Sequence, residues 1–221
     1  DGEIRQTVPE DIEKWAKVCD ALDNIDFSSP IGLLRKEKEN VQDILEARQV
    51  MANTSKPVMF CSWDERGTED IFDMASIAVG GKEQLKAKPY IMHYIEPVTP
   101  LSHSKEVMAQ TIFGAKNNLP TIYTPMPSAG AVSPMTFAGS IALGIAESLT
   151  GITLAQLVNE GAPMITGGIY SILDMKTSGF VYGGPEFVLM NGAVAEMSNY
   201  LGLPMFGTAG VTDSKLVDTQ A

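Results

Sequence analysis

Residues Pro57-Val-Met-Phe-Cys61 decide the fold, because this junction of a proline with a short apolar run returns four more times along the chain. The other copies are Pro89-Tyr-Ile-Met-His93, Pro120-Thr-Ile-Tyr-Thr124, Pro163-Met-Ile-Thr-Gly167 and Pro204-Met-Phe-Gly-Thr208. Proline is tolerated at the first residue of a strand, where it removes no ladder hydrogen bond. Apolar runs without polar alternation indicate strands that are buried on both faces, as in parallel sheets. The pattern therefore predicts five buried strands.

Stretches with helical spacing of apolar residues separate these strands. We expect helices at Glu39–Ala52, Lys105–Asn117 and Pro185–Leu201, the last ending at Gly202 as a glycine cap. Ser133 and Pro134 predict the cap and first residue of a further helix that runs through Phe137, Ile141, Ile145 and Leu149. A sixth strand is expected at Asn24–Phe27, after a helix over Glu10–Leu22.

A strand roughly every 30 to 40 residues with a helix between is the (β/α) repeat, which builds barrels or doubly wound sheets. Six strands are fewer than the eight of a closed barrel. We therefore expect a single domain over residues 1–221 that is an incomplete (β/α)8 TIM-type barrel and part of a longer chain. A complete open α/β sheet is the structural alternative.

The composition excludes several classes of function. The chain has 221 residues with a formal net charge of −11, and nucleic-acid binding would need a basic surface. Two cysteines are too few for a disulfide framework. No apolar run is expected to reach the length of a membrane span. These features predict a soluble, cytoplasmic protein, and its acidic balance is compatible with a cationic substrate as well as with an ordinary solvated surface.

In a barrel of this type, the functional residues lie at the carboxyl ends of the strands and in the loops that follow. Those positions are rich in aromatic rings and carboxylates, which together suit a quaternary ammonium group. The predicted substrate-binding residues are Trp63, His93, Tyr94, Glu96, Tyr170, Tyr182 and Glu186. The alternative is that the rings fill space under loops and that His93 is a core residue. The sequence identifies no catalytic residue, and with two histidines and no suitable cysteine pair it predicts no metal site.

Several segments taken together resemble the trimethylamine methyltransferase (MttB-like) family. They are Tyr94–Leu101, Gly139–Leu149, Leu154–Pro163, Asp174–Gly179, Tyr182–Glu186 and Gly210–Lys215 with Asp218 and Gln220. The resemblance extends from about residue 56 to the last residue and is specific only as a set.

The resemblance implies a barrel-shaped catalytic subunit that passes a methyl group from a small methylated amine to the Co(I) of a separate corrinoid protein. The enzyme itself would hold no tightly bound cofactor, because the partner supplies the cobalamin. Family members are about twice as long as this chain. The archaeal trimethylamine enzymes carry pyrrolysine, which this sequence lacks. The resemblance therefore favours the branch without pyrrolysine, whose members act on quaternary amines such as glycine betaine.

Two other functions stay open from the sequence. Gly167-Gly168 could form a backbone phosphate site in a different TIM-barrel enzyme, such as a lyase or an isomerase of phosphorylated ligands. A non-catalytic betaine-binding protein would need the same aromatic pocket. The outer helices are the expected interface if the protein forms a homo-oligomer.

Overall fold

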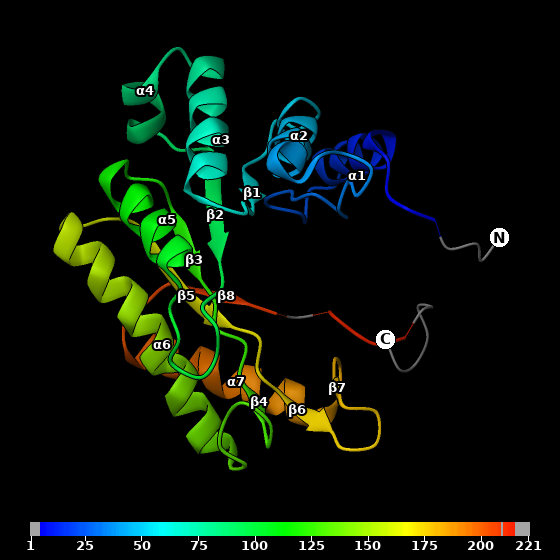
Figure 1. Cartoon of the computed structure of the whole chain (residues 1–221), viewed down its shortest axis with the longest axis vertical. Helices are drawn as coiled ribbons and strands as arrows, with labels where there is room; N and C mark the ends of the chain where they lie inside the picture. Colours follow the sequence, from blue (N-terminus) through cyan, green and yellow to red (C-terminus); the bar gives the residue numbers. More distant parts are fainter. Residues whose placement is uncertain (1–4, 209, 215–221) are drawn as a thin grey trace. The chain divides into compact units, whose positions relative to one another are not determined.

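The structure is a computed structural model, and it describes residues 5–208 and 210–214 (Figure 1). The chain divides into two compact units. The first unit contains Asp1–Tyr94 and Ile112–Thr121, and the second contains Ile95–Thr111 and Ile122–Ala221. Three residues of the family resemblance, Lys215, Asp218 and Gln220, lie outside the described residues.

The first unit alternates helices and parallel strands. Its elements are α1 (Pro9–Ala21), α2 (Glu39–Met51), β1 (Val58–Phe60), α3 (Glu65–Ala78), α4 (Lys82–Ala87) and most of β2 (Ile91–Ile95). β1 and β2 are parallel, with Phe60 opposite His93. The backbone N–H of His93 donates to the carbonyl of Pro120 over 2.8 Å, so the chain leading into the next strand continues the sheet.

Apolar residues at helical and strand spacing build the core of this unit. α2 packs against both α1 and α3 (Figure 1). The buried cluster combines Ile12 of α1, Val50 of α2, Phe60 of β1, Ile71 of α3 and Leu119. Each helix contributes one apolar face to this core. Alternate residues of β1 and β2 are buried and those between them are half-buried, so the predicted burial on both faces is not found in these two strands.

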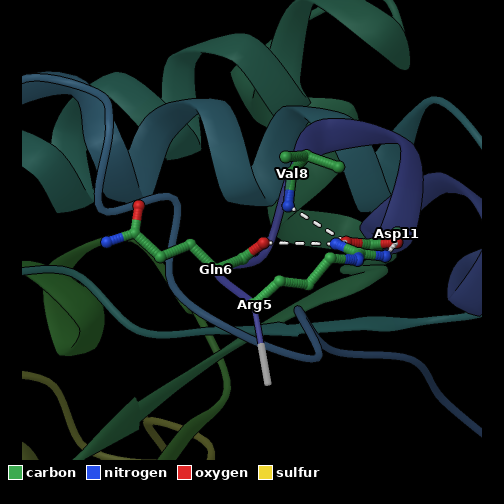
Figure 2. Close-up of polar contacts among 4 residues, drawn as sticks. All are labelled: Arg5, Gln6, Val8 and Asp11. Carbon is green, nitrogen blue, oxygen red and sulfur yellow. Dashed lines mark hydrogen bonds and ion pairs between the residues drawn. The ribbon is translucent and has the colours of Figure 1, made fainter. Parts of the chain in front are cut away.

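The first turn of α1 is held by Asp11, as Figure 2 shows. Its carboxylate accepts a hydrogen bond from the backbone N–H of Val8 over 3.1 Å and two from Arg5 over 2.5 and 2.6 Å. Arg5 also donates to the carbonyl of Gln6. The hydrogen bonds from Arg5 and Val8 hold the pKa of Asp11 well below its usual range. The positive end of the helix dipole also stabilises a carboxylate at this position.

The second unit contains two sets of strands. Its elements are the end of β2, most of α5 (Lys105–Lys116), β3 (Thr121–Tyr123), β4 (Ser128–Ala129), α6 (Phe137–Val158), β5 (Met164–Gly168), β6 (Ser171–Asp174), β7 (Gly179–Phe180), α7 (Pro185–Tyr200) and β8 (Met205–Gly207). β5 and β8 are parallel, with Gly167 opposite Phe206. β4 pairs in parallel with β6, which pairs antiparallel with β7.

The helix α6 packs on β5 and α7, beside which it lies in Figure 1. It is the one helix in the described part of the chain that is long and apolar enough to cross a membrane by length and composition. This corrects the expectation that no apolar run reaches that length, and it is weak evidence because core helices pass the same test. The buried residues of α6 are small or polar, and they include Gly144, Glu147 and Ser148. These residues face the interior of this unit.

All five proline-led strands are present as β1, β2, β3, β5 and β8, and each begins within two residues of its proline. Their predicted burial is confirmed at every position only for β3, and β8 is half-buried to exposed. The helices α1, α2, α5 and α7 are confirmed within a few residues, and Gly202 has the positive φ of a glycine cap. The chain therefore has a mixed α/β fold with parallel strands.

Other expectations were wrong. Asn24–Phe27 forms no strand, and only Ser28 makes an isolated parallel bridge, to Val58. The cap of α6 is Thr136 rather than Ser133, because the Thr136 side chain accepts from the N–H of Gly139 while Ser133 bonds Ser140. The segment after Gly168, for which the sequence predicts no strand, contains β6 and β7.

Candidate substrate-binding site

Tyr182 lies in the second unit, directly after the short hairpin of β6 and β7. The hairpin turn is closed by Asp174, whose carboxylate accepts from the N–H of Lys176 and from the hydroxyl of Thr177. Beyond the hairpin, the N–H of Val181 donates to the carbonyl of Ile172 over 3.3 Å. β6 therefore fixes the backbone that carries Tyr182.

Two phenylalanine rings flank Tyr182. The ring of Phe180 lies 5.0 Å from that of Tyr182 between centroids, and the ring of Phe187 lies 6.0 Å away on the other element, α7. Phe187 is buried, whereas Phe180 and Tyr182 are half-buried. The cluster thus presents partly accessible aromatic faces on a buried base.

Two carboxylates act on Tyr182. The backbone N–H of Tyr182 donates to the carboxylate of Asp213 over 3.1 Å. Burial raises the pKa of the Tyr182 hydroxyl, and the negative charges of Glu96 and Asp213 raise it further. Glu96 is exposed and follows β2 directly. Tyr182 is therefore a neutral phenol in a negative electrostatic environment.

Gly183 brings the segment that carries Asp213 against Tyr182. Gly183 has φ +73, and a β-carbon there would lie 3.2 Å from the carbonyl oxygen of Val211. A larger residue would strain the backbone and push this segment away. On the side of Gly183 toward α7, an open groove of about 420 Å³ is lined by residues that include Phe187, Asn191 and Met205. Its volume falls in the range of small-molecule sites.

The arrangement at Tyr182 suits a cation that cannot donate hydrogen bonds. A quaternary ammonium group is held by the faces of aromatic rings and by nearby negative charge, both of which are present. We call Glu96, Phe180, Tyr182, Phe187 and Asp213 the ammonium cluster. Two of the seven predicted residues, Tyr182 and Glu96, are brought together in it.

Trp63 lies in the first unit, at the carboxyl end of β1. Its side chain is 58% exposed and lines an open groove of about 630 Å³ together with residues such as Arg35 and Glu37. Its backbone N–H donates to the carboxylate of Asp43 over 3.1 Å. Asp43 is buried, and this burial raises the pKa of its carboxyl group.

His93 is completely buried in the first unit. Its ring stacks on Phe60 with centroids 4.7 Å apart, and its Nε2 lies 2.9 Å from the hydroxyl of Ser62. Burial lowers the pKa of His93 to about 3, so the ring is neutral at physiological pH. Its Nδ1 has no hydrogen-bond partner among the described residues. These contacts fit the core histidine that the sequence left as an alternative.

The remaining predicted residues have separate surroundings. Tyr94 is half-buried on β2, and Glu186 is half-buried in the first turn of α7. Tyr170 is wholly buried, and its ring fills the space beside Gly144 and Gly168. Its ring therefore has no accessible face in this chain.

Sequence reasoning missed Phe180 and Phe187, and it included Asp213 only within the family segment Gly210–Lys215. The signal for Phe180 was its alternation with Tyr182 on an extended segment. Asp213 could not be paired with Tyr182 from the sequence, since the two residues are distant in the chain. Within the described ranges, no three side chains of histidine, cysteine, aspartate or glutamate gather as a metal site would require.

The chain thus has a mixed α/β fold with parallel strands and, in its second unit, a cluster of aromatic rings and a carboxylate. The sequence model of the family "Trimethylamine methyltransferase (MTTB)" matches residues 1–221, so the chain belongs to this family. The resemblance stated from the sequence motifs is thereby confirmed.

Among its relatives is the glycine betaine methyltransferase of Desulfitobacterium hafniense (strain Y51), which is 32% identical over 100% of this chain and 46% of its own length. The trimethylamine methyltransferase MttB of D. hafniense (strain DSM 10664 / DCB-2) is 32% identical over 99% of the chain and 44% of its own length. MttB of Methanosarcina thermophila is also 32% identical, over 97% and 45%. The chain thus spans less than half the length of these curated relatives.

Proposed function

We propose that the full-length protein is a cytoplasmic methyltransferase that takes a methyl group from a quaternary amine such as glycine betaine. The acceptor is the Co(I) of a separate corrinoid protein, which binds at the carboxyl ends of the strands. The described chain would be one part of a (β/α)8 barrel domain. The observation that carries the proposal is the ammonium cluster, in which the ring of Tyr182 contacts two other rings and its backbone N–H donates to the carboxylate of Asp213.

The chemistry needs little from the protein. The Co(I) nucleophile attacks the methyl carbon, a Co–C bond forms, and the electron pair of the broken C–N bond stays on nitrogen. Cobalt is formally oxidised to Co(III), and the leaving tertiary amine needs no proton. The enzyme therefore contributes binding, alignment and exclusion of water. This fits a cluster of rings and carboxylates without an acid–base pair.

The fold gives Gly167 and Gly168 a packing role, which removes the reason to propose a backbone phosphate site there. A β-carbon on Gly167 would lie 2.4 Å from the carbonyl oxygen of Phe206, and one on Gly168 would lie 2.0 Å from the ring of Tyr170. Glycine is therefore required at position 167 because β8 packs against it, and at position 168 because the ring of Tyr170 packs against it. A betaine-binding protein without activity is distinguished from an enzyme only by the transfer reaction itself.

The ammonium cluster can be tested by measuring the affinity of the full-length protein for glycine betaine by calorimetry. Tyr182→Ala is expected to raise the dissociation constant about tenfold, because it removes the ring that faces the cation. Tyr182→Phe should keep it within about twofold, since the ring face remains. Glu96→Gln should weaken binding by a smaller factor, because one negative charge is lost.

Tyr200→Ala is the matched control, because Tyr200 is 83% exposed at the end of α7 and outside the cluster. Equal affinity in wild type, Tyr182→Ala and Glu96→Gln would reject the cluster as the amine site. Trp63, His93, Tyr94, Tyr170 and Glu186 would then be the next predicted residues to replace.

A further inference from the structure

Glu147 is a carboxylate in the middle of α6 that the proposed function does not use. Its side chain is fully buried, and both of its oxygens accept hydrogen bonds. Oε2 accepts from the hydroxyl of Thr99 over 2.8 Å, and Oε1 accepts from the backbone N–H of Leu101 over 2.6 Å. No arginine, lysine or histidine among the described residues forms an ion pair with it.

A buried carboxylate that is not paired with a cation destabilises the folded state. Removing the charge from water is costly, and two hydrogen bonds recover only part of the cost. The charge also contributes, after burial, to raising the pKa of two neighbouring hydroxyls, those of Tyr123 and Tyr170. An apolar residue would fill this position of α6 at lower cost, which indicates that the two hydrogen bonds serve a positional purpose.

Both donors belong to the loop that joins β2 to α5 and begins with Glu96. Within this loop, Val98 and Ser102 exchange two backbone hydrogen bonds of 2.8 and 3.0 Å. Between them, Leu101 adopts the left-handed conformation with φ +52, which a residue with a side chain rarely adopts. The bond from the N–H of Leu101 to Glu147 holds the loop in this shape.

The far end of the loop is fixed separately. Nδ1 of His103 lies 2.6 Å from the hydroxyl of Tyr123, at the end of β3. The loop is thus tied to α6 by Glu147 and to β3 by His103. Glu96 is exposed at its other end, and its negative charge adds to burial in raising the pKa of the Tyr182 hydroxyl.

We propose that Glu147 is a positioning residue of the ammonium cluster: by fixing Thr99 and Leu101, it sets where the carboxylate of Glu96 lies relative to Tyr182. This inference rests on the proposed function, because it takes the cluster as the amine site. Glu147 itself touches neither substrate nor acceptor. Its effect on binding therefore passes through Glu96.

The test is a double-mutant cycle with tetramethylammonium chloride as the probe, measured by calorimetry on the full-length protein. Glu147→Gln keeps the size of the side chain and removes one of the two acceptor oxygens. We expect it to raise the dissociation constant by about threefold to fivefold in the wild-type background, which is no more than the effect of Glu96→Gln itself. In a Glu96→Gln background, the same substitution should change the dissociation constant by less than about twofold, because the group that it positions is gone.

Thr99→Val removes one donor and leaves Glu147 in place, so it tests the same link if Glu147→Gln does not fold. It should weaken binding of tetramethylammonium in the wild-type background and have little effect in the Glu96→Gln background. Glu160→Gln is the matched control, because Glu160 is an exposed carboxylate just after α6.

Equal weakening by Glu147→Gln in both backgrounds would overturn the inference, since the effect would then not pass through Glu96. No weakening at all would also overturn it. In either case, weak binding by Tyr182→Ala and Glu96→Gln would leave the proposed site standing. A wild-type protein that binds neither tetramethylammonium nor glycine betaine would instead reject the proposed function itself.

Discussion

Two glycines of α6 lie against tyrosine rings so closely that no β-carbon would fit. A β-carbon on Gly144 would lie 2.4 Å from the hydroxyl oxygen and 2.7 Å from ring carbons of Tyr170. One on Gly151 would lie 2.5 Å from the ring of Tyr123. Glycine in a helix interior destabilises the helix relative to alanine. At these two positions it is needed because only a residue without a β-carbon lets the tyrosine rings pack against α6. The rings of Tyr123 and Tyr170 are consequently buried at the ends of β3 and β5.

Replacing Gly144 with alanine should destabilise the protein by about 1–3 kcal/mol, because the buried Tyr170 ring has no free space to move into. Gly192→Ala in α7 is the control, since nothing lies within 4 Å of its β-carbon position. That substitution should stabilise by about 0.5–1 kcal/mol. Urea denaturation of the two variants measures the difference, and equal effects would show that the ring packing is not tight.

His93 should make the stability depend on pH. Its pKa is about 3 in the folded protein and near 6.5 when exposed. Between these values the unfolded chain binds more protons, so the free energy of unfolding falls as the pH is lowered, by at most about 1.4 kcal/mol per pH unit. The contribution is fully present above pH 6.5 and is lost toward pH 3.

Burial raises the pKa of Asp43 and Glu46, and these groups act in the opposite direction. The comparison must therefore be made between wild type and His93→Gln, in which the other groups are unchanged. The variant should show a shallower fall in stability between pH 6 and pH 4 by urea denaturation. Parallel curves would contradict the buried neutral histidine.

At the scale of the elements, the sequence predicts most of the fold because each core strand has the same local signature. A proline followed by an apolar run identifies β1, β2, β3, β5 and β8 without any knowledge of their neighbours. α3 was missed although Asp64 is a good cap residue, because its apolar positions were not compared with helical spacing. β6 and β7 are short, and they depend on pairing with each other and with β4, which local sequence does not specify.

The cap of α3 gives a prediction at this scale. The carboxylate of Asp64 accepts from the N–H of Gly67 over 2.8 Å, which satisfies one of the free donors of the first turn. Asp64→Ala should destabilise the protein by about 1 kcal/mol. Glu69→Ala, an exposed position within the same helix, should have a much smaller effect. Equal loss in the two variants, measured by thermal unfolding, would reject the capping role.

At the scale of the whole molecule, the candidate site was only partly predictable from the sequence. The carboxyl ends of the strands indicated Glu96, and the motif around Gly183 indicated Tyr182. Their association with Asp213 depends on a contact between distant segments, which is made at Gly183. Tyr170 and His93 are buried and present no accessible ring face. The pattern of a single sequence does not specify which side chains are buried at the ends of strands.

The most direct test of the central claim is methyl transfer by the full-length protein to free cob(I)alamin. The protein is mixed with cob(I)alamin and, in turn, with glycine betaine, carnitine, proline betaine and trimethylamine, and methylcobalamin formation is followed by absorbance. We expect methylation from one quaternary amine and none from trimethylamine. No methylcobalamin from any amine, with cob(I)alamin shown to be competent in a chemical methylation, would contradict the proposed activity.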